Sequence, residues 1–329
     1  MDQTSAADLG MHILEVEITT RCNLNCKHCY NRSFDPVDLP LETIKELYRF
    51  ADAHHVWTFT ISGGEALLHR QFGELVDFIR QTPHDFRLVL QSNGTLLSEN
   101  QWEKLRAFDL VHLSFDPVED VRLHGSSNLN LASRLKEAGI DNYVFATIHK
   151  KNRDLVDDMV AMANQAGVPI GFNICIPVER LDPSFLMSRE EFMETEKHLA
   201  DLYATGAILR YSSPLVSILD PKKRGTFDGI HGGCTAGVGA CVVGPTGEVY
   251  PCPFFRVSGG NIFKTPLEKL WSESELFNKI RDRQAFTEPC RSCDRLAFCG
   301  GCRNRAFRKT GDVQGADPMC YKDALGKTD

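Results

Sequence analysis

The segment CNLNCKHCY, residues 22–30, directly follows a short apolar run, HILEVEI (12–18), which predicts a buried strand. Its thiols have the spacing C-x3-C-x2-C and belong to Cys22, Cys26 and Cys29. Three thiolates can ligate three irons of a [4Fe–4S] cluster, since each iron takes one cysteine sulfur, and the fourth iron then stays open to another ligand. The alternative is a zinc site completed by His28, which lies in the tight loop between two of these cysteines.

Short apolar runs alternate with amphipathic stretches as far as about residue 205. The runs that predict strands are HILEVEI (12–18), VWTFTI (56–61), FRLVLQS (86–92), LVHLSF (110–115), YVFATI (143–148) and PIGFNICI (169–176). The stretches that predict helices include 41–54, 72–81, 130–139, 155–167 and 189–203. Such alternation predicts βαβ units and a parallel sheet. Six units predict an α/β fold, an open, partial (β/α)6 barrel of TIM-like form, with function at the C-terminal strand ends.

The chain changes character after about residue 205. The predicted division is a barrel at 1–205, a linker at 206–233 and a small cysteine-rich domain at 234–329. Within the last part, ACVVGPTGEVYPC (240–252) predicts a hairpin that turns at Pro245–Gly247, and residues 266–283 predict one helix. The remainder has little apolar periodicity, so we expect bound metal to hold it together.

The composition is that of a soluble globular protein, because 42% of the 329 residues are hydrophobic and 25% are charged. The formal net charge of -7 gives no electrostatic case for binding nucleic acid or a membrane surface. The N-terminus lacks the features of a secretory signal, and no run approaches the ~18 to 20 apolar residues of a membrane span, so we expect a cytoplasmic location. In that compartment, twelve cysteines favour metal or cluster ligation over disulfides.

Eight of the cysteines crowd the C-terminal part of the chain: Cys234, Cys241, Cys252, Cys290, Cys293, Cys299, Cys302 and Cys320. Eight thiolates suit two iron–sulfur clusters with four cysteines each. Two structural zinc sites are the alternative, and the spacing within 290–302 alone supports either metal.

The segment CNLNCKHCY resembles the cluster motif of the radical S-adenosylmethionine superfamily, and SGGE at 62–65 resembles its methionine-binding motif, one strand later. The resemblance implies that the open iron chelates S-adenosylmethionine and that Gly63, Gly64 and Glu65 contact its methionine amino group. By the same resemblance, the ends of the third and fourth strands supply further cofactor contacts, namely Ser92, Asn93, Ser114 and Asp116. A turn or cap role is the alternative for each of these four residues.

The C-terminal array reads C-x12-G-x4-C, then C-x2-C-x5-C-x2-C and a last cysteine. It resembles the SPASM extension of these enzymes, with one gap a residue shorter than usual. The resemblance implies two auxiliary clusters with interleaved ligands: Cys234, Cys241, Cys252 and Cys302 for one, and Cys290, Cys293, Cys299 and Cys320 for the other. Some relatives leave one iron open for substrate at the position of Cys241.

The resemblance implies reductive cleavage of S-adenosylmethionine to a 5′-deoxyadenosyl radical, which abstracts hydrogen from a substrate. Relatives with this extension commonly modify ribosomally made peptides or proteins, and we expect that activity here. The second hypothesis is a small-molecule enzyme that acts on a tetrapyrrole. The segment CGGCRNRAFRKTGD (299–312) also resembles enzymes of haem or haem d1 biosynthesis. A non-enzymatic electron carrier or zinc scaffold is the third.

The expected partners are a peptide, protein or small-molecule substrate and an external one-electron reductant such as flavodoxin or ferredoxin. Because only eleven residues precede the first predicted strand, we expect either a separate peptide-recognition protein or a substrate that is not a leader-bearing peptide. Cys175, in the sixth predicted strand, remains outside the cluster sets. A buried strand cysteine is usually a small hydrophobe, and the alternative is a catalytic hydrogen donor to a substrate radical.

Overall fold

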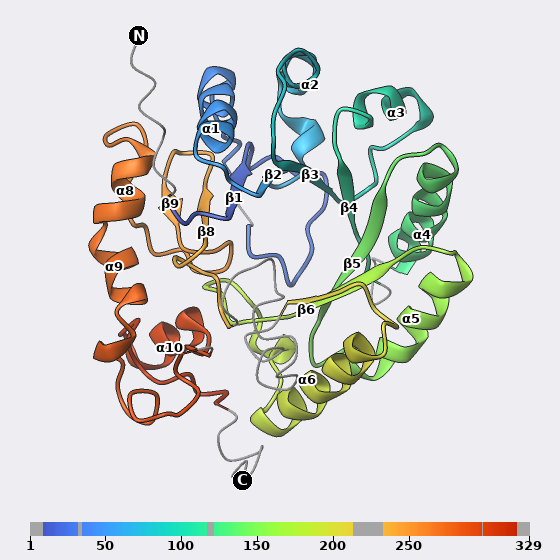
Figure 1. Cartoon of the computed structure of the whole chain (residues 1–329). Coiled ribbons are helices and arrows are strands. Elements are labelled where there is room, and N and C mark those ends of the chain that lie inside the picture. The colour runs from blue at the N-terminus through green and yellow to red at the C-terminus, as the bar shows by residue number, and fades with distance from the viewer. Residues whose placement is uncertain (1–8, 32–34, 117–121, 213–232, 298, 321–329) are drawn as a thin grey trace.

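A curved, mostly parallel sheet with helices along its outer side forms the frame of the molecule (Figure 1). The computed structural model describes residues 9–31, 35–116, 122–212, 233–297 and 299–320. Its strands have the order β7-β6-β5-β4-β3-β2-β1-β8-β9, and every neighbouring pair is parallel except β8 and β9. This topology confirms the predicted α/β fold with a partial TIM-like barrel.

The six predicted strands are confirmed to within two residues at each end. The strands are β1 (Ile13–Glu17), β2 (Thr58–Ser62), β3 (Arg87–Ser92), β4 (Leu110–Ser114), β5 (Asn142–Ile148), β6 (Ile170–Ile174), β7 (Arg210–Ser212), β8 (Ala240–Val243) and β9 (Val249–Tyr250). The helices are α1 (Leu41–Ala53), α2 (Phe72–Gln81), α3 (Glu99–Leu105), α4 (Arg122–Glu137), α5 (Val156–Gln165), α6 (Arg189–Ala204), α8 (Leu267–Glu273), α9 (Glu275–Arg281) and α10 (Arg303–Thr310). None of the helices in these described segments is long and apolar enough to cross a membrane.

Local chemistry explains several helix boundaries. Gly139 and Gly167 follow α4 and α5 with φ values of 71° and 64°, the left-handed conformation that glycine adopts without strain. Helix α6 begins with a capping box, in which the Ser188 side chain accepts from the Glu191 amide and the Glu191 carboxylate accepts from the Ser188 amide. These ends fix where the chain turns back toward the next strand.

The prediction of a single helix for residues 266–283 is wrong, because the chain forms two helices there, α8 and α9. Ser274 separates them with an extended backbone, at φ -58° and ψ 127°. The break lets Trp271 and Phe277 bury themselves side by side, with ring centroids 5.5 Å apart. Amphipathic spacing alone does not reveal such a break, since both halves keep helical periodicity.

The cysteine-rich part extends the barrel sheet. Strand β8 pairs in parallel with β1, with Leu14 opposite Cys241, and continues into the predicted hairpin with β9, which is confirmed. Trp271 of α8 also donates its indole hydrogen to the Leu9 carbonyl at 2.7 Å. At the other sheet edge, β7 falls in the stretch predicted as a linker, while residues 213–232 of that stretch lie outside the described residues.

Strand β1 carries charge on its inner face. Leu14 and Val16 belong to the apolar core, and alternation along the strand turns Glu15 and Glu17 to the opposite side. Glu15 accepts a 2.6 Å hydrogen bond from Ser62 of β2. Burial raises the pKa of Glu15 to about 7, and the neighbouring Glu17 carboxylate adds to the rise.

We predict that Glu15 makes the free energy of unfolding depend on pH. Because its folded pKa of about 7 exceeds the unfolded value of 4.5, its stabilising contribution is complete below pH 4.5 and is lost as pH rises through 7. The stability of wild type relative to Glu15→Gln should therefore fall by about 2–3 kcal/mol between pH 5 and pH 8 in urea unfolding. The exposed Glu46→Gln is the matched control, and a difference that stays flat with pH would contradict the prediction.

Candidate active site at the carboxyl ends of the strands

The loop that carries the first three cysteines is closed at its base by a short antiparallel bridge. Thr19 lies opposite Asp38 in this bridge. The Thr20 amide donates to the Val37 carbonyl at 2.8 Å, and the Leu39 amide donates to the Ile18 carbonyl at 2.8 Å. The chain that leaves β1 is thus paired with the chain that returns to α1, so the cysteine loop begins from a fixed stem.

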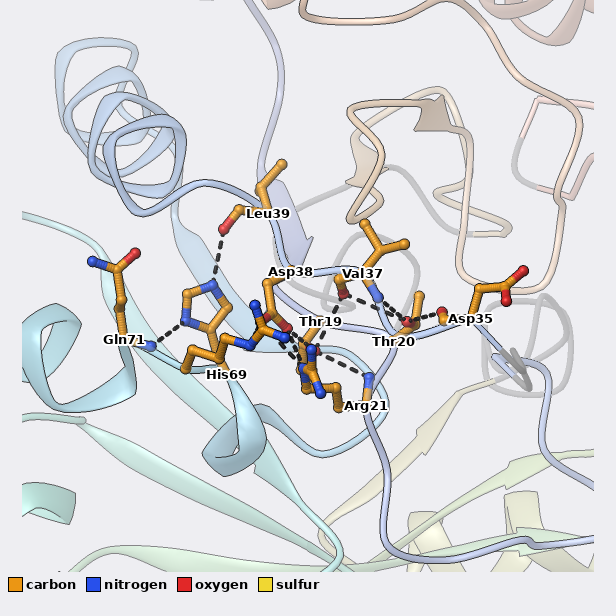
Figure 2. Close-up of polar contacts among 10 residues, drawn as sticks. Thr19, Thr20, Arg21, Asp35, Val37, Asp38, Leu39, His69 and Gln71 are labelled. Carbon is orange, nitrogen blue, oxygen red and sulfur yellow. Dashed lines mark hydrogen bonds and ion pairs between the residues drawn. The ribbon is translucent and has the colours of Figure 1, made fainter.

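Side chains reinforce this stem (Figure 2). Asp38 accepts hydrogen bonds from Thr19 Oγ1 at 2.5 Å and from Arg21 Nε at 3.1 Å. Burial by itself raises the pKa of Asp38, but the hydrogen bonds from Thr19 and Arg21 outweigh it, so the pKa is lowered and the carboxylate stays charged. Asp38 therefore holds the residue that directly precedes Cys22.

His69 ties the same stem to the turn before α2. Its Nε2 lies 2.8 Å from the Leu39 carbonyl, and its Nδ1 accepts from the Gln71 amide at 3.1 Å. A carbonyl only accepts and an amide only donates, so the Nε2-protonated tautomer satisfies both contacts. His69 is buried, and these two hydrogen bonds hold the returning chain in place.

The glycines of SGGE lie against the stem itself. The Gly64 amide donates to the Thr19 carbonyl at 2.8 Å, and the Glu65 amide donates to the Arg21 carbonyl at 2.7 Å. A Cβ at Gly64 would lie 2.3 Å from the Arg21 carbonyl oxygen, and one at Gly63 would lie 2.5 Å from that of Thr19. Glycine is therefore required because two backbone segments touch here.

The Glu65 side chain joins the ends of β2 and β3. Its buried carboxylate accepts from Ser92 Oγ at 3.0 Å and from the Asn93 amide at 2.7 Å. Burial raises its pKa, although these hydrogen bonds oppose the rise. The side-chain nitrogen of Asn93, Nδ2, donates to Asn23 Oδ1 at 3.0 Å and lies 3.9 Å from Cys22 Sγ. SGGE, β3 and the cysteine loop are thus one hydrogen-bonded unit.

The end of β4 approaches the same loop. Asp116 Oδ2 lies 3.5 Å from His28 Nδ1, and the rings of His28 and His149 are 5.7 Å apart. The Ser114 side chain is exposed, whereas its carbonyl accepts from Asn128 Nδ2 at 2.6 Å. Asn128 also donates to the Asn93 carbonyl at 2.8 Å, so it links the ends of β3 and β4. Sequence reasoning missed Asn128, because an asparagine within a helix, here α4, gives no distinguishing signal.

The thiols of the cysteine loop lie near one another. Burial raises the pKa of Cys26 to about 11, and the Cys29 and Cys22 thiols contribute to the rise. A single zinc ion would draw sulfur ligands to about 3.8 Å from one another, given Zn–S bonds of about 2.3 Å in a tetrahedron. Within the described ranges, the only set of three or more potential ligands within 4.8 Å of one another is His28, Asp116 and His149, with no cysteine. The thiols of Cys22, Cys26 and Cys29 are therefore not all within 4.8 Å of one another, as ligation of one zinc ion would require.

The C-terminal cysteines form two groups. The first is Cys234, Cys252 and Cys302, since burial and the other two thiols raise the pKa of Cys252. The second is Cys290, Cys299 and Cys320, since burial raises the pKa of Cys299 to about 11 with contributions from Asp317 and the other two thiols. Cys293, half-buried, has its thiol 3.6 Å from Asp294 Oδ1.

Cys241 lies apart from both groups. Its buried thiol is 3.8 Å from the Met11 sulfur, in the apolar core between β8, β1 and the C-terminal helices. Burial raises its pKa to about 12, and the one charge that acts on it is Arg281. Leu14, opposite it in β1, faces the same core, because residues in register share a face.

Cys175 follows β6 at the same edge of the sheet as the cysteine loop. Its amide donates to the Ile148 carbonyl at 2.7 Å, which continues the pairing with β5. Burial raises the pKa of its thiol to about 12, so it stays protonated at neutral pH. The thiol thus carries the S–H hydrogen that a donor role would need.

Comparison with known proteins agrees with this geometry. The sequence pattern of the Radical SAM superfamily matches residues 16–166, and that of SPASM, an iron–sulfur cluster-binding domain, matches residues 234–294. An AdoMet-dependent heme synthase of Methanosarcina barkeri is 29% identical, over 92% of this chain and 94% of its own length. A PqqA peptide cyclase of Streptomyces rochei is 28% identical, over 97% of this chain and 91% of its own.

A solved structure shares the fold. Streptococcus suis SuiB bound to precursor peptide SuiA superposes with a TM-score of 0.75 over 95% of this chain and 76% of its own, at 18% identity. At that identity the likeness concerns the fold alone. By the two matched sequence patterns, at residues 16–166 and 234–294, the chain belongs to the radical SAM superfamily. More narrowly, it is a radical SAM enzyme with a SPASM domain, which uses S-adenosylmethionine and iron–sulfur clusters.

We predict that Gly64→Ala removes the first cluster and leaves the others. Its Cβ would meet the Arg21 carbonyl at 2.3 Å, so the stem of the cysteine loop must shift. After anaerobic reconstitution, iron should fall from about twelve to about eight per chain, since each [4Fe–4S] cluster carries four irons. Gly73→Ala in α2 is the control, because the nearest atom would be 3.9 Å away. Full iron and unchanged cofactor cleavage in Gly64→Ala would contradict the prediction.

Proposed function

We propose that this enzyme modifies a ribosomally made peptide or protein by abstracting a hydrogen atom from one of its side chains. The observation that carries this proposal is the similarity to a PqqA peptide cyclase, which extends along 97% of this chain and 91% of that protein. Such chemistry requires iron–sulfur clusters, and the cysteines of residues 22–29 and 234–320 supply thiols to ligate them. When bound, the cluster and S-adenosylmethionine supply the 5′-deoxyadenosyl radical, which no protein side chain can replace.

The proposed roles of the residues follow from where they lie. Cys22, Cys26 and Cys29 ligate the first cluster and leave one iron for the cofactor. Gly63, Gly64 and Glu65 shape the methionine end of the cofactor site through their contacts with the stem and with β3. The residues proposed to line the rest of that site are Ser92, Asn93, Ser114 and Asp116. Asp116 has its carboxylate beside the cysteine loop, where it can accept hydrogen bonds from a ribose.

The proposed auxiliary sites follow the two thiol groups. Cys234, Cys252 and Cys302 hold one cluster, and Cys290, Cys293, Cys299 and Cys320 hold the other. The packing of the Cys241 thiol against Met11 supports a first auxiliary cluster in which one iron is left for another ligand. We further propose a cytoplasmic location, where thiols stay reduced for cluster binding, an external reductant such as flavodoxin or ferredoxin, and a separate peptide-recognition protein.

A tetrapyrrole is the second candidate substrate. The observation that favours it is the heme synthase relative, whose similarity covers 94% of its own length. Both candidates share the same radical chemistry, so the choice depends on the substrate alone.

The test is anaerobic reconstitution followed by substrate trials. We expect about twelve irons per chain and release of 5′-deoxyadenosine upon reduction with dithionite. Precursor peptides encoded beside the gene and porphyrin precursors of haem are then supplied separately, and products are read by mass spectrometry. A mass change in a peptide supports the proposal. Turnover of the tetrapyrrole alone would overturn the peptide assignment, and zinc in place of iron would overturn the whole function.

Cys241 in β8 and Cys252, two residues after the end of β9, provide a matched pair for the ligand assignment. We expect Cys241→Ala to keep about twelve irons, whereas Cys252→Ala should lose the first auxiliary cluster, about four irons. The reason is that the Cys241 thiol packs against Met11 in the apolar core. Iron analysis and Mössbauer spectra measure both variants. Equal iron loss in the two would show that Cys241 is a ligand.

For Cys175, we propose a hydrogen-donor role toward a substrate radical. If it holds, Cys175→Ala should leave cofactor cleavage intact but change or abolish the final product, because the substrate radical would go unquenched. The measurement is product analysis with deuterium-exchanged enzyme, which should place deuterium in the wild-type product. An identical product from Cys175→Ala would eliminate the role and leave the thiol as a small apolar side chain.

A further inference from the structure

Arg303 is a buried cation with an incomplete set of partners. It is the first residue of α10, directly after Cys302, and its exposed fraction is 2%. Its Nη1 donates to the carbonyls of Val313 at 2.8 Å and Gly315 at 2.9 Å. Its guanidinium lies 4.2 Å from the centroid of the Phe286 ring. These contacts fix the plane of the guanidinium and its orientation.

The remaining nitrogens of Arg303, Nε and Nη2, are buried and have no hydrogen-bond partner among the residues that the structure describes. Arg305, two residues on, differs sharply, because its Nε and Nη2 both donate to Asp317. A buried N–H without an acceptor costs roughly 1–3 kcal/mol, and more when it is charged. A fold that gives Arg305 a carboxylate and leaves two nitrogens of Arg303 without an acceptor therefore implies a further acceptor beyond the described residues.

The position of Arg303 indicates which acceptor this is. A Cβ at Gly301 would lie 3.1 Å from Arg303 Nη2, so this nitrogen lies against the loop between Cys299 and Cys302. Gln314, between the two carbonyl partners of Arg303, accepts from the Thr287 amide at 2.9 Å, and the Thr287 carbonyl accepts from the Cys290 amide at 3.0 Å. Arg305 instead pairs with Asp317, which accepts from the Cys302 amide at 2.7 Å. Each arginine is thus associated with a different thiol group.

We propose that Arg303 Nε and Nη2 donate hydrogen bonds to the sulfur atoms of the auxiliary cluster held by Cys290, Cys293, Cys299 and Cys320, and so raise its reduction potential. The inference rests on the proposed ligand sets. Net charge and hydrogen bonds to sulfur set the potentials of such clusters. Because reduction adds one negative charge, a fixed neighbouring cation favours the reduced state. Arg303 is a positioning residue that makes this cluster a better electron acceptor.

The test compares Arg303→Gln and Arg303→Lys with Arg308→Gln, an exposed arginine on the same helix. Each holoprotein is reconstituted anaerobically and titrated with reductant while EPR follows the signals that S-adenosylmethionine leaves unchanged. We expect Arg303→Gln to shift one auxiliary reduction equilibrium at least tenfold toward the oxidised state, which is about 59 mV for a one-electron couple. Arg303→Lys should recover part of the shift, and Arg308→Gln should show none. An unchanged potential in Arg303→Gln with full iron overturns the proposal.

A measurement on the wild-type holoprotein decides the matter if Arg303→Gln loses its cluster. Arginine labelled with 15N should give a hyperfine coupling to the reduced auxiliary cluster in pulsed EPR, and absence of this coupling overturns the proposal. Failure of the proposed function looks different. In that case the wild type would bind no auxiliary clusters or would not cleave S-adenosylmethionine, whatever residue occupies position 303.

Discussion

The ion pair between Glu17 and Arg256 is the interaction on which the arrangement of the two cluster-bearing parts depends. Glu17 ends β1 with none of its surface exposed, and Arg256 Nη1 donates to its Oε2 at 2.9 Å while Nη2 donates to Oε1. Burial alone lowers the pKa of Arg256, but the carboxylate outweighs it and the pKa is raised. The guanidinium also lies 5.1 Å from the Tyr30 ring and 4.8 Å from the Tyr250 ring. Loss of either charge would leave the other buried without a partner, which costs several kcal/mol of folding free energy.

This pair connects three functional pieces because of where β1 lies. Strand β1 pairs with β2 on one side and β8 on the other, so the cysteine loop, SGGE and the cysteine-rich hairpin all emerge from one parallel assembly. Parallel pairing brings carboxyl ends to one edge of a sheet, which is the general reason that active sites of such folds gather there. The stem around Asp38 then fixes the loop, and Glu65 fixes SGGE to β3.

Charge is distributed unevenly around the C-terminal thiols. Asp317 neutralises Arg305 and also accepts from the Cys302 amide at 2.7 Å, so one arginine serves the protein's own structure. Arg303 has no such carboxylate partner among the described residues and lies beside the other thiol group. A cysteine-rich segment with little apolar core thus uses buried arginines both to hold its fold and to complement the charge of what it binds.

The sequence by itself determined the six barrel strands and the cysteine spacings, because both are local patterns: apolar alternation, glycine at helix ends and thiols a few residues apart. It did not reveal β7, the pairing of β8 with β1, the break at Ser274 or the location of Cys241 in the core. Strand β7, the pairing of β8 with β1 and the location of Cys241 depend on contacts between residues far apart in the chain, whereas the break at Ser274 depends on how Trp271 and Phe277 pack. Glu17 and Arg256, 239 positions apart, meet only because the sheet aligns them, and no local pattern records that contact.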